Sequence, residues 1–105
     1  MDIAVNELAR QYASRVNEQF KPKAIYLYGS QVKGTAHQHS DIDIAVVFTP
    51  IDIHKQMDIL SDLLSIAAKF DANIEPNVLI DDGEYCRFSF LAEVMETGRL
   101  ICTKK

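Results

Sequence analysis

The chain has 105 residues, 48% of them hydrophobic, which suits one domain spanning residues 1–105 around a single core. Its formal net charge of −4 argues against a domain that grips long nucleic acid by itself, because that affinity depends on Lys and Arg neutralising phosphates. No apolar run approaches the length of a membrane span and no cationic leader is visible, so a cytoplasmic protein without membrane contact is expected.

The first half of the chain predicts one helix and two strands. Apolar residues at helical spacing predict an amphipathic helix over residues 4–20, and Pro22 helps to end it. A short strand is expected at Ala24–Tyr28 and a second one at Asp41–Phe48. The apolar stripe of the helix consists of Val5, Leu8, Tyr12, Val16 and Phe20.

The second half predicts two helices and a third strand. A long amphipathic helix is expected from Asp52 to Phe70, a strand at Asn73–Ile80, a helix at 84–97 ended by Gly98, and an extended tail at Leu100–Cys102. The expected apolar positions of the two helices are Ile53, Met57, Leu60, Leu63, Leu64 and Ala67, then Phe88, Leu91, Val94 and Met95. This order predicts an α/β (α+β) fold with helices packed on a small mixed three-stranded sheet.

Cysteine and histidine give little sign of a metal or redox site. Cys86 and Cys102 lie far apart without a C-x-x-C motif, so buried or idle thiols are expected. His37 and His39 form an H-x-H pair in an expected loop, where ordinary loop histidines are favoured over a metal clamp.

Two acids, Asp41 and Asp43, stand at the start of the second strand, although Asp is depleted from strands. Alternation places both carboxylates on one strand face, roughly 6–7 Å apart. Two anions on one face favour a cation between them, and Mg²⁺ is held by one or two carboxylates together with the phosphates of a substrate. For this D-x-D alone, a solvated strand end is the simpler interpretation.

Gly29-Ser30 at the end of the first strand changes that interpretation. In parallel strands it would lie a strand length from Asp41, roughly 17–20 Å, whereas antiparallel strands bring the two together. The ten residues 31–40 are also short for a parallel crossover, so antiparallel strands are expected. Gly29 would then leave room for a ligand and Ser30 would open a helix whose N–H groups bind phosphate, with a simple turn and N-cap as the alternative.

Gly29-Ser30, the ten residues that follow and Asp41-Ile42-Asp43 resemble the signature of the DNA polymerase beta-like nucleotidyltransferase superfamily. Gly34 and Ser40 add the G-S-x-x-x-G and S-D-I-D patterns of its minimal nucleotidyltransferase branch. The resemblance implies a nucleotidyltransferase fold and enzyme. It implies Mg²⁺-assisted transfer of a nucleoside monophosphate, AMP from ATP, to an acceptor hydroxyl, with one or two ions on the acidic pair.

The resemblance also implies further site residues. A third carboxylate normally completes the family's metal site, and alternation along the third strand places Glu75 on its polar face. A right-handed crossover makes this strand parallel to the second, so Glu75 is the predicted third ligand, with Asp71 or no third ligand left open. Gly29, Ser30 and Ser40 are expected to bind the nucleotide, and Lys33 either touches the triphosphate or is a solvated helix lysine.

A chain this short lacks the extra domain with which larger relatives hold base and acceptor, so a partner is expected. The resemblance implies the antitoxin half of a toxin–antitoxin pair that adenylylates a helical HEPN-type toxin. The alternatives are a catalytically weak module that neutralises or scaffolds such a partner, and a transferase acting on a small-molecule hydroxyl. Acceptor, base preference, homo-oligomerisation and the activity of the isolated chain are not determined by the sequence.

Overall fold

The computed structural model describes residues 3–29, 41–70, 73–84 and 89–103. The first five elements begin and end within one residue of the boundaries that the sequence predicts. The elements are α1 (Ile3–Phe20), β1 (Ala24–Tyr28), β2 (Ile42–Phe48), α3 (Ile53–Phe70), β3 (Ile74–Ile80), α4 (Phe90–Thr97) and β4 (Arg99–Thr103).

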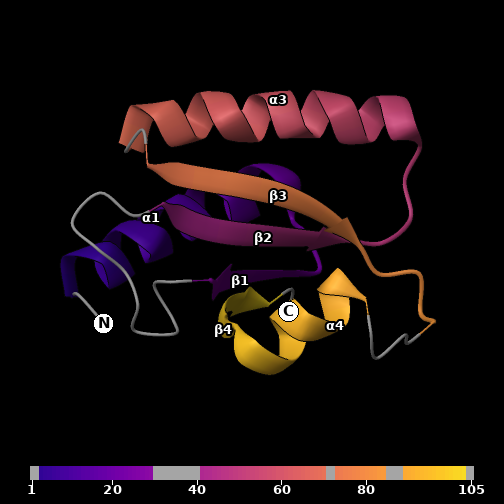
Figure 1. Cartoon of the computed structure of the whole chain (residues 1–105). Coiled ribbons are helices and arrows are strands. Elements are labelled where there is room, and N and C mark those ends of the chain that lie inside the picture. The colour runs from indigo at the N-terminus through magenta and orange to yellow at the C-terminus, as the bar shows by residue number, and fades with distance from the viewer. Residues whose placement is uncertain (1–2, 30–40, 71–72, 85–88, 104–105) are drawn as a thin grey trace.

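The sheet has four strands in the order β3-β2-β1-β4 (Figure 1). β1 is antiparallel to β2 and β4, whereas β2 is parallel to β3, so both predicted strand relations are confirmed. The prediction of three strands was wrong. The tail expected to be merely extended pairs with β1 as β4, and thereby satisfies backbone N–H and C=O groups that an open edge strand would leave unpaired.

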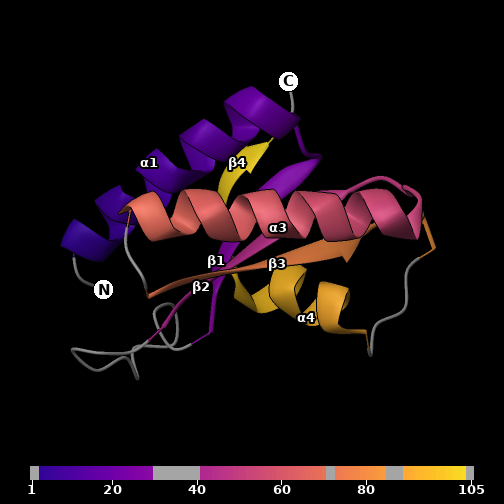
Figure 2. The same ribbon diagram turned by 90° about the horizontal axis from the view of Figure 1, so that it is seen from above.

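The sheet lies between helices. α1 and α3 pack through the core against one face, and Figure 2 shows α1 and α4 on opposite sides of the sheet. The largest fully buried side chains include Tyr12, Ile25, Leu27, Ile44 and Leu63. The buried Tyr12 hydroxyl donates a hydrogen bond of 2.9 Å to the Leu63 carbonyl, which ties α1 to α3, and burial raises the pKa of Tyr12.

α3 buries only part of the apolar face that the sequence predicts, and Leu63 and Ala67 are the predicted positions that are buried. Its buried residues are Ile59, Leu63, Ile66 and Ala67. Three residues of the predicted apolar face are exposed, Ile53 by 61%, Met57 by 64% and Leu64 by 49%. The apolar arc of this helix is wider than the surface it contacts, so only the half that faces the core is covered.

α4 is shorter than predicted. It begins at Phe90, and the Ser89 hydroxyl caps it by accepting a hydrogen bond of 3.0 Å from the Ala92 N–H, so Glu84 is not helical. Ala92 and Val94 are its buried residues, whereas Met95 is 43% exposed. The helix ends at Gly98 as predicted.

Some residues that the sequence analysis discusses lie outside the described residues, namely Phe88, Cys86, His37 and His39. Among the helices that the structure describes, none has the length and apolar character of a membrane span.

Candidate functional site

A row of three polar side chains crosses the sheet where β1 ends and where β2 and β3 begin. Asp43 on β2 is paired with Tyr28 on β1 and with Glu75 on β3. Residues paired across strands share a face of the sheet. The neighbours of Asp43 on β2, Ile42 and Ile44, are buried in the core beneath α1 and α3, so the row lies on the opposite face.

The three predicted acids interact directly. The charge of Asp41 raises the pKa of Glu75, and so does side-chain hydrogen bonding to Asp41 and Asp43. Burial raises the pKa of Asp43, the charge of Asp41 adds to the rise, and a hydrogen bond with Glu75 lowers it. Since Glu75 shares hydrogen bonds with both aspartates, the structure brings together the three side chains that the sequence singles out.

Gly29, at the end of β1, lies against Asp43. Its φ of +77° is in the region that L side chains rarely adopt, and a Cβ at this position would collide with the Asp43 carboxylate. Glycine therefore serves two ends here, because it permits the turn after β1 and leaves the space that the carboxylate occupies.

Three residues that lie beside the acids were not among the site residues predicted from the sequence. The Asn77 side-chain amide donates a hydrogen bond of 2.6 Å to the Tyr28 hydroxyl, reaching across β2. The Phe90 ring meets the Tyr28 ring edge-on, with centroids 5.5 Å apart, and remains 48% exposed. Burial raises the pKa of Tyr28, as do the charges of Asp43 and Glu75, whereas the bond with Asn77 lowers it. Alternation along β1 and β3 could have placed Tyr28 and Asn77 on the acidic face, but nothing local in the sequence links Phe90 to it.

The donor chemistry of the cluster fits a hard divalent cation, because every donor is a carboxylate oxygen. Asp41 and Glu75 are exposed, so their oxygens remain accessible. Within the described ranges, however, no group of three His, Cys, Asp or Glu side chains is arranged so that it could hold a metal ion. The acids meet through hydrogen bonds instead, and the third ligand stays a prediction.

Four other sequence-based site residues lie outside the residues that the structure describes. They are Ser30, Lys33 and Ser40, expected at the nucleotide, and Asp71, the alternative third ligand.

Known proteins match both this sequence and this fold. The family model "Polymerase beta, Nucleotidyltransferase" matches residues 11–105. The chain is 33% identical over 66 residues to MJ0126 of Methanocaldococcus jannaschii, described as a candidate protein adenylyltransferase, and the match covers 59% of this chain and 67% of that protein.

Two solved structures share the fold. A candidate nucleotidyltransferase from Sulfolobus solfataricus superimposes with a TM-score of 0.68 and 23% identity over 97% of this chain and 83% of that one. A chain from a toxin–antitoxin structure with AMP-PNP superimposes with a TM-score of 0.58 and 24% identity over 91% and 74%. This chain belongs to the polymerase beta nucleotidyltransferase family, in its minimal nucleotidyltransferase branch. It is accordingly a transferase, as the sequence predicts.

Proposed function

We propose that this nucleotidyltransferase moves AMP from ATP to a hydroxyl of a helical HEPN-type toxin and thereby acts as its antitoxin. The observation that carries the proposal is the gathering of Asp41, Asp43 and Glu75 on one face of the sheet beside Gly29. Such a site suits transfer at phosphorus, because in-line displacement requires charge neutralisation and positioning more than covalent help.

Asp41 and Asp43 are the residues proposed to hold Mg²⁺, and Glu75, which interacts with both, is the proposed third ligand. When bound, the ion would neutralise charge on the phosphoryl oxygens and on the leaving pyrophosphate. Burial and the charge of Asp41 raise the pKa of Asp43, and the charge of Asp41 raises the pKa of Glu75, so a bound cation would offset a repulsion between like charges at this position. Strand pairing on both sides, with Tyr28 on β1 and Glu75 on β3, fixes the backbone of Asp43 at this position.

The residues proposed at the nucleotide are Gly29, which follows β1, and Ser30, Lys33 and Ser40, which lie outside the described residues. Gly29 is proposed to bind the nucleotide through its backbone, next to the Asp43 carboxylate that occupies the space beside its Cα. Ser30 and Ser40 are proposed to donate hydrogen bonds to the phosphates, and Lys33 to offer them a positive charge. These three assignments rest on the sequence motif.

The proposed partner rests on what relatives are said to do. MJ0126 is described as a candidate protein adenylyltransferase, and one neighbour in fold comes from a toxin–antitoxin structure that contains AMP-PNP.

The decisive experiment is a transfer assay with purified proteins. This chain is incubated with labelled ATP, Mg²⁺ and the small helical protein encoded by an adjacent gene, and the products are analysed by intact-protein mass spectrometry. An AMP adduct on a partner hydroxyl, absent with the Asp43→Asn variant, is the expected result. If the partner is bound and inhibited without an adduct, and neither RNA nor small hydroxyl compounds accept AMP, the chain is a binding module instead.

Binding of the nucleotide is tested separately from transfer. Mg²⁺ and ATP together should raise the thermal unfolding temperature of the wild type, because a ligand that binds only the folded state stabilises it by mass action. The double variant Asp41→Asn with Asp43→Asn should show no shift. An equal shift in both proteins would refute the metal assignment while leaving the fold and family intact.

A further inference from the structure

A polar groove of about 480 Å³ lies between α1 and the start of β4, away from the acid cluster. Its lining residues are Asn6, Arg10, Ala13, Ser14, Asn17, Arg99, Leu100 and Ile101. Asn6, Arg10, Ala13 and Asn17 follow one another at intervals of four, three and four residues, so they form one stripe along α1. Ala13 is buried and small, and it forms a floor between longer side chains.

The groove is positively charged in an acidic chain. It contains two arginines and no carboxylate, although the chain carries 15 acidic and 11 basic residues. Neither Arg10 nor Arg99 forms an ion pair with any residue in the described ranges. Two guanidinium groups accompanied by amide and hydroxyl donors are suited to a carboxylate or phosphate ligand.

The groove adjoins an edge of the sheet. β4 is the last strand in the order β3-β2-β1-β4, and within the described residues no strand pairs with its outer side. An edge strand presents backbone N–H and C=O groups to which an extended peptide can add as a further strand. Arg99 is paired with Leu27, whose side chain is buried in the core under α1, so Arg99 lies on the α1 face and the acid cluster on the other.

We infer that this groove binds an extended segment of a partner protein that carries acidic side chains at alternate positions. The segment pairs with the outer side of β4 and directs its carboxylates towards Arg10 and Arg99. A protein segment fits better than a nucleic acid, because two arginines neutralise few phosphates and the net charge of −4 repels a long polyanion. The inference concerns the opposite face of the sheet from the acids and does not depend on which acceptor receives a nucleotide.

The test uses a fluorescent peptide of alternating Glu and Val, with a Gln-Val peptide of the same length as its neutral control. Titration into ¹⁵N-labelled protein should shift the amide signals of the α1 stripe and of β4, and should slow amide exchange along β4. The double variant Arg10→Gln with Arg99→Gln should bind about tenfold more weakly, since exposed charge pairs each contribute modestly. Arg15→Gln removes the same charge from the outside of α1 and should bind like the wild type.

Each other outcome contradicts the inference. An equal loss of peptide affinity in Arg15→Gln would show that the peptide is attracted by overall charge and not by a specific site. Equal binding of the Gln-Val peptide would show that the acidic side chains do not contribute to binding. Signal shifts without slower β4 exchange would exclude strand pairing, and an RNA oligonucleotide that binds more tightly and displaces the peptide would assign the groove to nucleic acid. The double variant should retain the Mg-ATP thermal shift, which separates failure of this inference from failure of the proposed function.

Discussion

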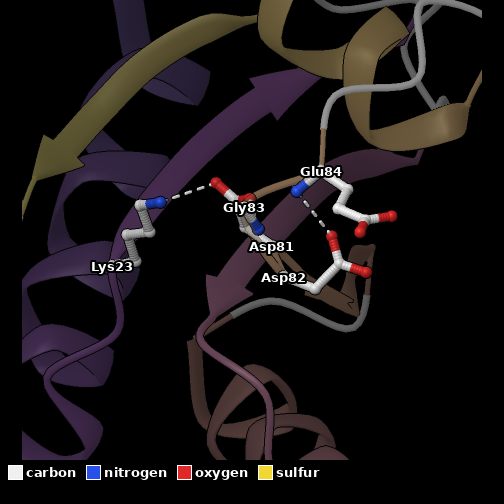
Figure 3. A network of polar contacts seen from close by, with 5 residues as sticks. All are labelled: Lys23, Asp81, Asp82, Gly83 and Glu84. Atoms are coloured by element: carbon white, nitrogen blue, oxygen red, sulfur yellow. Dashed lines mark hydrogen bonds and ion pairs between the residues drawn. The ribbon is translucent and has the colours of Figure 1, made fainter.

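The two ends of the parallel strands β2 and β3 differ in how their charged side chains are arranged: carboxylates cluster at one end, and a carboxylate is paired with a lysine at the other. Where the strands begin, acids gather and the pKa of Glu75 is raised, first by the charge of Asp41. Just beyond the far end, the Lys23 ammonium donates to the Asp81 carboxylate at 2.6 Å, and this bond lowers the pKa of Asp81 (Figure 3).

The far end is also satisfied by its own backbone. The Asp81 carboxylate accepts a hydrogen bond of 3.0 Å from the Gly83 N–H, and Asp82 accepts one of 2.9 Å from the Glu84 N–H (Figure 3). Lys23 and Asp81 further donate their backbone N–H groups to the carbonyls of the last two residues of β2. The fold itself neutralises the charge of Asp81, whereas a cluster of like charges with raised pKa values marks a candidate functional site.

The largest effect expected is on transfer, from Asp43→Asn. The fold should survive, because the change is nearly isosteric, but the rate should fall by about a thousandfold as the site loses charge stabilisation. Rates measured under single-turnover conditions check this. Asp81→Asn removes a carboxylate from the opposite end and should leave the rate unchanged; a comparable fall there would mean that both variants act through stability.

Glu75→Gln should reduce transfer almost as far, because residues that act on one cluster are strongly non-additive. Its stability should rise at neutral pH. The pKa of Glu75 is raised in the folded protein, so protonated Glu75 stabilises the wild type at a pH below its unfolded-state pKa. The wild type loses this stability as the pH rises through the folded-state pKa of Glu75, whereas the Gln variant has no such group to titrate. Urea unfolding of wild type and variant from about pH 4 to pH 8 should therefore show a gap that widens with pH.

If Glu75→Gln retains transfer activity, Glu75 is not a metal ligand. Should Asp71→Asn lose activity in that case, the third ligand precedes β3. If neither change matters, Asp41 and Asp43 act alone.

Gly29→Ala and Gly83→Ala compare the two ends through backbone alone. Both glycines have positive φ, +77° and +86°, so each alanine should cost about 1 kcal/mol of unfolding free energy through strain. A Cβ at Gly83 meets nothing within 4 Å, whereas one at Gly29 displaces Asp43. Only Gly29→Ala should therefore lose transfer activity and show a further fall in the free energy of unfolding. Equal transfer rates and equal stabilities of the two variants would contradict the contact between Gly29 and Asp43.

The smallest effect is expected from Lys23→Met, which removes the ion pair with Asp81. A lowered folded-state pKa contributes stability above the unfolded-state value, and this is lost as pH falls through the folded-state value. The variant should thus be slightly less stable than wild type at neutral pH and equal to it in acid. Because the lysine side chain is half exposed, high salt should also remove the difference. A difference insensitive to salt and pH would point to lost packing by the lysine stem.

Local pattern determined much of this protein. Alternation along residues 73–80 correctly separated buried Ile74 and Pro76 from Glu75, because successive side chains on a strand must point to opposite faces. The short connection after Gly29 likewise favoured antiparallel strands, because ten residues are short for a parallel crossover, and the structure confirms this pairing. The alternation along a strand and the length of a connection can both be read from the sequence. Together they predicted that Asp41, Asp43 and Glu75 would lie close to one another.

Tertiary packing decided the rest. The last residues became β4 only because β1 offered an unpaired edge, and local propensity does not report whether such an edge exists. α3 left Ile53 and Met57 exposed because the surface it covers is narrower than its apolar arc. Phe90 reached Tyr28, and Arg99 came to line one groove with Arg10, through packing between elements distant in sequence. Such contacts depend on how whole elements pack against one another, which no short window of residues contains.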